Sequence, residues 1–137
     1  MRERGAEPSP KRPLVLVIDS NGERGAGLAR LIGAAGYDVQ TTPHERALHL
    51  LRDGHSFGAV ILRAAAEPST LSARDCLGEF VARYMKHVVP ELLACTVVLT
   101  TLAPGLGAFP GTRAVMREPF RDDELLDALA ACVGNAR

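Results

Sequence analysis

The sequence lacks an excess of charge of either sign. Its 16 lysine and arginine residues balance 16 aspartate and glutamate residues, which leaves no formal net charge at pH 7. Proteins that bind the phosphate backbone of nucleic acids carry a basic surface, so we expect no direct nucleic-acid binding. No apolar run approaches the roughly 18 residues of a membrane span, and no apolar segment follows the charged start before Pro13, as it would in a signal peptide. We therefore expect a cytoplasmic protein without a membrane partner.

Cysteine is also scarce. The three cysteines, Cys76, Cys95 and Cys132, are odd in number and widely spaced, and no C-x-x-C pair occurs. The histidines are His44, His49, His55 and His87. Neither set has the spacing of a disulfide framework or a zinc site. We therefore expect reduced thiols in or near a core, histidines on a solvated surface, and no bound metal or other cofactor.

The sequence does contain enough apolar material for one core. Hydrophobic residues make up 47% of the 137 positions, and a chain of this length is typical of a single domain. Residues 1–12 are polar and contain prolines, which predicts a flexible tail. The domain itself is expected to span residues 13–134.

Five short segments predict β-strands. They are Leu14–Ile18, Tyr37–Thr41, Phe57–Leu62, Thr96–Thr101 and Arg113–Met116. The first is a continuous β-branched and aliphatic run, which is typical of a strand buried on both faces. The second alternates between apolar and polar residues, which predicts a half-buried strand at the edge of a sheet.

Helical periodicity fills most of the intervals between these segments. The expected apolar faces comprise Leu28, Leu31, Ile32 and Ala35; Ala47, Leu48 and Leu51; Leu77, Phe80, Val81 and Tyr84; and Leu125, Leu126, Leu129 and Val133. Thr42-Pro-His-Glu45 predicts a capping box at the start of the second helix. Residues 102–112 are rich in glycine and proline and predict no helix, so the fourth helix is expected to be short or absent.

Strands that alternate with helices predict an α/β domain, in which a doubly wound parallel sheet has helices on both faces. In such sheets, functional residues lie at the carboxyl ends of the strands. The side chains at those ends are Asp19, Ser20, Arg63, Thr100, Thr101, Arg117 and Glu118.

Four motifs at these strand ends resemble the receiver domain of bacterial response regulators. They are Val17-Ile-Asp19-Ser20, Val60-Ile-Leu-Arg63, Val98-Leu-Thr100-Thr101 and Met116-Arg-Glu118-Pro-Phe120. They match, in order and spacing, the family's acidic pair, phospho-accepting aspartate, conserved hydroxyl residue and Lys-Pro-Phe position. The resemblance covers residues 13–134 and implies a five-stranded, flavodoxin-like sheet of order 2-1-3-4-5. It also implies a non-enzymatic role in bacterial two-component signal transduction.

The departures from the family pattern concern its chemistry. Arg63 replaces the phospho-acceptor, Glu118 replaces the lysine, Ser20 replaces the second acid, and Val115 replaces the switch aromatic, whereas Asp19 and Thr100 keep the family identity. Arginine cannot form an acyl phosphate, and one acid beside a guanidinium is a poor Mg²⁺ site. We therefore predict a degenerate site, a pseudo-receiver that is not phosphorylated by the family's route.

Two of these substitutions are reciprocal, because Arg63 introduces a cation and Glu118 introduces an anion. The predicted arrangement is an ion pair between Arg63 and Glu118, shared with Asp19. Burying such a pair cancels much of the Coulomb attraction. The alternative is an Arg63 side chain that lies along the sheet rim and points its charge to solvent. Asp19 can equally serve as a residue at the helix start.

Other chemistry finds little support in the order of the chain. Gly22-Glu-Arg-Gly25-Ala-Gly27 only loosely resembles a dinucleotide-binding fingerprint, because Arg30 occupies the last glycine position. No Ser-His-Asp or Cys-His arrangement is apparent, and no helix-turn-helix follows Val133. We therefore expect no enzymatic activity.

Two hypotheses about function remain open. The first is a phosphorylation-independent interaction module that binds a protein partner, a second copy of the chain being one candidate. Its surface candidates are Leu106, Phe109 and Val115, although Leu102, Leu106 and Phe109 can instead tuck beneath their loop. The second hypothesis is a small anionic ligand or nucleotide held at the strand ends, with Arg63 as the anchor.

Overall fold

The sheet of this domain has five parallel strands. The structure, a computed structural model, describes residues 13–52, 57–64, 77–100 and 109–133. The elements in chain order are β2 (Leu14–Ile18), α1 (Gly22–Ala34), β3 (Asp38–Thr42), α2 (His44–Arg52), β4 (Ala59–Arg63), α3 (Leu77–Val88), α4 (Pro90–Leu93), β5 (Thr96–Thr100), β6 (Ala114–Arg117) and α5 (Asp122–Val133). Their spatial order is β3-β2-β4-β5-β6, all parallel, which confirms the predicted order 2-1-3-4-5.

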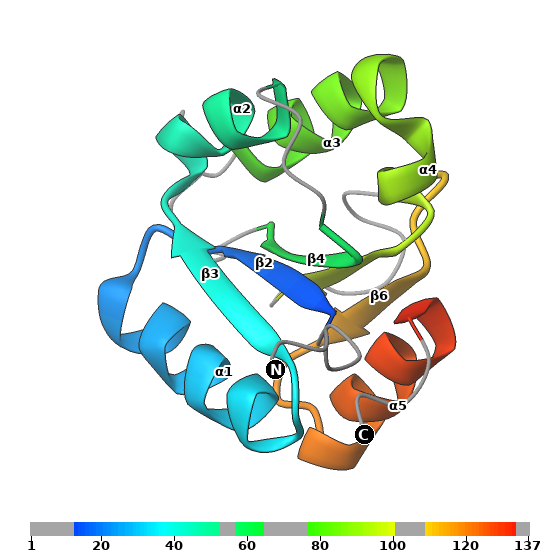
Figure 1. Ribbon diagram of the computed structural model, residues 1–137. Helices are drawn as coiled ribbons and strands as arrows, with labels where there is room; N and C mark the ends of the chain where they lie inside the picture. Colours follow the sequence, from blue (N-terminus) through cyan, green and yellow to red (C-terminus); the bar gives the residue numbers. More distant parts are fainter. Residues whose placement is uncertain (1–12, 53–56, 65–76, 101–108, 134–137) are drawn as a thin grey trace, which may run out of the picture.

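Helices cover both faces of this sheet. Figure 1 shows α1 and α5 on one side and α2, α3 and α4 on the other. The chain runs in one direction across the sheet from β2 to β3 and in the opposite direction from β3 through β4 and β5 to β6. Because crossover connections between parallel strands are right-handed, α1 lies on one face and α2 and α3 lie on the other. The predicted doubly wound α/β architecture is therefore confirmed.

The central strands supply residues to two cores, one on each face. Val15 and Val17 pack with Leu28 and Ile32 of α1, whereas Leu16 and Ile18 pack in the core with α2 and α3. All residues of β4 and β5 are buried, as expected for strands covered on both faces. The edge strand β3 is only partly buried, which matches the alternation of its sequence.

The third helix differs from its predicted pattern. Val81 is buried and Tyr84 is half-buried, but Phe80 is 49% exposed, so the predicted apolar face is wrong at this position. The helix instead uses Met85, which is fully buried, because residues three and four positions apart share a face. Pro90 ends this region by starting the short helix α4 at its first position, where the missing proline N–H costs nothing.

Phe109 lies inside the domain, not on its surface. Its side chain is 8% exposed and packs in the core between the sheet and α2, α3 and α4. The expectation of Phe109 as a surface residue is therefore wrong, and the alternative of a tucked side chain holds for this residue. Leu102 and Leu106 lie outside the described residues. So does most of the interval 102–112, in which a helix between β5 and β6 was expected to be short or absent. Residues 109–113 contain no helix.

Within the described residues, no helix combines the length and apolarity needed to cross a membrane.

Candidate functional site

One buried cation joins three strand ends at the carboxyl edge of the sheet. Arg63, the last residue of β4, donates from Nε to Oδ2 of Asp19 at 2.6 Å and from Nη1 to Oε1 of Glu118 at 2.5 Å. Asp19 follows β2 and Glu118 follows β6. The structure therefore brings together the three residues of the predicted ion pair, and the guanidinium points to its partners, not to solvent.

The backbone holds both carboxylates in place. The N–H of Asp19 donates to the carbonyl of Thr42 at 2.9 Å, and its Oδ1 accepts the N–H of Asn21 at 2.9 Å. The N–H of Glu118 donates to the carbonyl of Thr100 at 2.8 Å, and a cis peptide bond joins Glu118 to the next residue. Asp19 thus both pairs with the cation and shapes the turn that leads into α1.

The two partners of Arg63 differ in how deeply they are buried. The side chains of Arg63 and Asp19 are 6% and 2% exposed, whereas that of Glu118 is 23% exposed. Burial by itself lowers the pKa of the Arg63 guanidinium, but hydrogen bonds and charge from Glu118 and Asp19 outweigh this effect and raise the pKa. Arg63 is therefore a permanent cation, and the cluster of one cation and two carboxylates has an excess of negative charge.

Ser20 and Thr100, the other predicted site residues, make different contacts. Thr100 is buried at the end of β5, and its carbonyl positions Glu118. Ser20 is exposed and contacts His44: its Oγ lies 2.7 Å from Nδ1 and accepts the backbone N–H of His44 at 3.2 Å. The order of the chain gave no sign of this contact, because Ser20 and His44 are 24 positions apart.

His44 is buried, so its prediction as a solvated residue is wrong. Its side chain is 8% exposed, and Nε2 lies 2.6 Å from the carbonyl oxygen of Arg63. A signal for this burial was present, because His44 precedes Ala47 and Leu51 at the spacing of one helix face. His49 on the same helix is exposed, as expected. The start of α2 is therefore joined to both Ser20 and the end of β4.

The predicted capping box at the start of α2 takes a different form. The hydroxyl of Thr42 donates to the carbonyl of Pro43 at 3.1 Å. The acceptor for the first-turn N–H of His44 is instead Ser20, which comes from the loop between β2 and α1. Any hydroxyl oxygen that reaches an orphan N–H at a helix start can cap it, and here the tertiary structure supplies it.

Several solved structures with a similar fold are response regulator receiver domains. A receiver domain from Clostridium thermocellum covers 88% of this chain and 94% of its own at 22% identity and a TM-score of 0.68. A response regulator receiver protein from Burkholderia phymatum covers 91% and 98% at 24% identity, with a TM-score of 0.68. This chain has the receiver-domain fold. A sensor protein from Polaromonas sp. JS666 also shares it, with 16% identity, 92% and 99% coverage and a TM-score of 0.73.

No family model and no curated protein sequence matches the chain. The likeness therefore lies in the receiver fold. The roles of the residues at the strand ends follow from their own contacts and charges.

The receiver fold places Arg63 at the position where the resemblance implies a phospho-accepting aspartate. A guanidinium has no oxygen nucleophile and repels a divalent cation. Among the described residues, no group of three or more histidine, cysteine, aspartate or glutamate side chains could hold a metal ion. Asp19 and Glu118, the two carboxylates at this site, share the guanidinium, so the arrangement holds the ends of three strands together.

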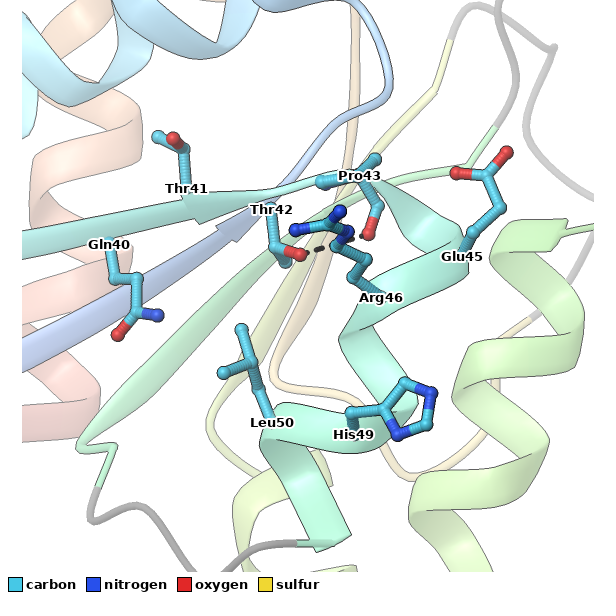
Figure 2. Close-up of a pocket in the computed structure, with 8 residues that line it drawn as sticks. All are labelled: Gln40, Thr41, Thr42, Pro43, Glu45, Arg46, His49 and Leu50. Carbon is cyan, nitrogen blue, oxygen red and sulfur yellow. Dashed lines mark hydrogen bonds between the residues drawn. The ribbon is translucent and has the colours of Figure 1, made fainter.

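A separate hollow lies between β3 and α2. Its volume is about 530 Å³, and its lining comprises Gln40, Thr41, Thr42, Pro43, Glu45, Arg46, His49 and Leu50 (Figure 2). Within the described part of the chain, the Arg46 guanidinium has no ion-pair partner. This hollow therefore presents a cation at the end of β3, in contrast to the neutralised Arg63.

Two of the three cysteines lie close together at the opposite end of the sheet. Cys95 precedes β5 and Cys132 lies near the end of α5, with Sγ of Cys95 3.9 Å from the carbonyl oxygen of Cys132. Both are free and half-buried. Burial raises the pKa of the Cys132 thiol to about 12, and the neighbouring Cys95 adds to the effect. Cys76 lies outside the described residues.

Proposed function

We propose that this domain is a pseudo-receiver, a phosphorylation-independent module that regulates or scaffolds a protein partner in a bacterial signalling pathway of the cytoplasm. The observation that carries the proposal is the Arg63 guanidinium, which is paired with Asp19 at 2.6 Å and with Glu118 at 2.5 Å. This cation occupies the place of the phospho-acceptor and uses the carboxylates that a metal would need.

Phosphoryl transfer to a receiver domain needs a carboxylate nucleophile, a divalent metal and a cation that neutralises the phosphate. This chain has Arg63 in place of the nucleophile and Glu118 in place of the cation. A phosphate would meet a net negative cluster, since two carboxylates surround one guanidinium. The missing nucleophile, the missing neutralising cation and the net negative charge therefore all oppose phosphorylation at this site.

The Arg63 cation also holds carboxylates together, as a bound metal ion would. In Mg²⁺ sites the metal holds carboxylates together through its own charge. Here the guanidinium joins the ends of β2, β4 and β6 permanently, because its raised pKa keeps it charged at every physiological pH. We therefore infer that the domain stays in one state and that its output does not depend on a phosphorylation switch.

The exposed edge strand β6 is the surface that we assign to a partner. Val115 at its centre is 49% exposed, with the exposed Arg117 two positions on, so the two side chains share a face of the strand. A patch of this kind fits a protein partner, because an exposed apolar side chain on an edge strand can pack against another protein surface. A second copy of the chain is one such partner.

Incubation with acetyl phosphate and Mg²⁺, followed by intact-mass measurement, tests the loss of phosphorylation. The wild-type domain should gain no phosphate. A receiver domain that retains its aspartate acceptor provides the positive control. A phosphate adduct on the wild-type chain would refute the proposal.

The partner is tested by affinity capture with the purified domain, with Val115→Asp as the matched surface variant. A specific partner should be retained by the wild-type domain and lost by the variant, whose core is unchanged. Sedimentation velocity of the same two proteins tests self-association directly. Identical capture by both proteins would contradict the assignment of β6 as the binding surface.

The hollow beside β3 supports a second candidate function, the binding of a small anion. The specific observation is the Arg46 guanidinium, which lines this hollow without an ion-pair partner among the described side chains. Thermal unfolding with and without phosphate separates the two sites, because a ligand that binds the folded state raises the melting temperature. A shift that disappears in Arg46→Ala but persists in Arg63→Ala would support an anion site at Arg46.

A further inference from the structure

Ser20 and His44 form a hydrogen-bonded pair that the proposed function does not use. The Oγ of Ser20 lies 2.7 Å from Nδ1 of His44, although the two residues are 24 positions apart in the chain. Ser20 is exposed, whereas His44 is 8% exposed. A nucleophile that faces solvent is therefore backed by a buried imidazole.

The second ring nitrogen of His44 determines the direction of this hydrogen bond. Nε2 lies 2.6 Å from the carbonyl oxygen of Arg63, and a carbonyl oxygen can only accept. Nε2 must therefore carry the ring proton, so that Nδ1 of the neutral imidazole accepts the hydroxyl proton of Ser20. The bond to Arg63 also fixes the plane and tautomer of the ring, which is the role of the third group in nucleophile–base pairs.

The oxygen of Ser20 is further polarised by the backbone. It accepts the N–H of His44 at 3.2 Å, and this donor can stabilise negative charge that develops on the oxygen. Helix α1 starts at Gly22, two positions after Ser20, so the positive end of its dipole lies next in the chain. The base and an N–H donor thus both contact the exposed hydroxyl oxygen of Ser20, while the Arg63 carbonyl orients the base from its other side.

We propose that Ser20 is a reactive nucleophile that accepts an acyl group from a small, uncharged activated ester, with His44 as its base. In this step, Oγ of Ser20 bonds to the acyl carbon while its proton passes to Nδ1 of His44. The bond from the acyl carbon to the alcohol oxygen breaks, and the proton then passes from His44 to that oxygen. The products are one acylated serine and one released alcohol, so the reaction is a stoichiometric modification of the chain.

The charge of the neighbouring cluster selects the class of electrophile. Asp19 precedes Ser20 directly, and the group of Asp19, Arg63 and Glu118 contains two carboxylates and one cation. A phosphate donor would carry its negative charge toward this cluster, whereas a neutral acyl ester meets no such repulsion. Acyl transfer is therefore favoured over phosphoryl transfer at this serine.

The test uses p-nitrophenyl acetate as the probe and peptide mapping by mass spectrometry as the readout. The wild-type domain should acquire an acetyl group on Ser20 and release p-nitrophenol, and Ser20→Ala should lose that adduct. His44→Asn retains an acceptor near Nδ1 but no base, so acetylation of Ser20 should slow by about 100-fold or more. His87→Asn, at an exposed histidine of α3, should leave the rate unchanged.

A synthetic peptide of residues 17–24 gives the reactivity of the same serine without His44, whether or not His44→Asn folds. Ser20 in the folded domain should react much faster than the serine of this peptide. The proposal is overturned if Ser20 of the wild-type domain stays unmodified, or if it reacts no faster than the peptide. Equal rates in wild type and a folded His44→Asn variant would also overturn it.

Discussion

Replacing Arg63 with alanine should destabilise the domain by about 3–5 kcal/mol, the range for removing one partner of a buried ion pair. The magnitude follows from burial. The Asp19 side chain is 2% exposed and would remain as a carboxylate without a cation, whereas Glu118 is 23% exposed and can turn partly toward water. Asp19 should therefore account for most of the cost. Urea denaturation monitored by circular dichroism measures it as a change in the free energy of unfolding.

A double-mutant cycle tests whether Glu118 is coupled to this cation. Glu118→Ala alone should cost about 1–2 kcal/mol, since it removes a partly exposed hydrogen bond between charged groups. When Arg63 is already alanine, Glu118→Ala should cost almost nothing. The hydrogen bond is then absent, and the change relieves the repulsion between the facing Asp19 and Glu118 carboxylates. The coupling energy should therefore be about 1–2 kcal/mol. Costs that add to within about 0.5 kcal/mol would refute the reasoning.

Two controls separate charge from packing. Arg63→Met keeps an apolar stem of similar length, so a cost close to that of Arg63→Ala assigns the effect to the lost charge. Arg117→Ala removes an exposed arginine from β6 and should change stability by less than about 0.5 kcal/mol.

The sign of the pH dependence follows from the raised pKa of Arg63. The pKa of Arg63 is higher in the folded than in the unfolded chain. The stability that its charge contributes is therefore complete below the unfolded pKa, and it is lost only as pH rises through the folded pKa. Deprotonation of Arg63 should therefore not weaken the pair at any physiological pH.

The remaining predictions compare residues of the same type, by urea denaturation unless stated. His44→Ala should cost about 1–3 kcal/mol, because it removes buried hydrogen bonds, and exposed His49→Ala less than about 0.5 kcal/mol. Buried Phe109→Ala should cost about 3–5 kcal/mol, and half-exposed Phe80→Ala less than about 1 kcal/mol. Equal costs within either pair would contradict the assigned burial. The Cys132 thiol, with its pKa raised from 9.0 to about 12, should react with iodoacetamide far more slowly in the folded than in the unfolded chain. A similar rate in both states would contradict this shift. Since the folded state holds this proton more tightly, stability should fall as pH rises from about 9 toward 12.

Much of the fold could be predicted because its signals are local. The run Leu14–Ile18 is apolar at every position, so it can only be buried on both faces, and Gly36 and Pro119 mark boundaries through backbone geometry. Alternation of such runs with helical periodicity leaves few topologies, since parallel crossovers are right-handed. The error at Phe80 arose because three- and four-residue spacing permits two adjacent apolar faces, and packing against α2 selects between them.

The candidate site could be predicted only where two substitutions were reciprocal. Arg63 and Glu118 exchange the charges of the family pattern, and opposite charges at the same edge of the sheet imply a contact. The helical spacing of His44 from Ala47 and Leu51 indicated its burial but not its partners, which are the hydroxyl of Ser20 and the carbonyl of Arg63. Both partners come from other strand ends, which the order of the chain leaves far from His44.

By itself, the sequence determined a parallel α/β domain and the presence of an arginine at position 63, because periodicity and residue identity are properties of the chain. The tertiary structure alone decided that Arg63 faces two carboxylates and that Ser20 faces His44. Parallel strands bring residues that are tens of positions apart to one edge of the sheet. Hydrogen-bond geometry at that edge then determines which side chains meet.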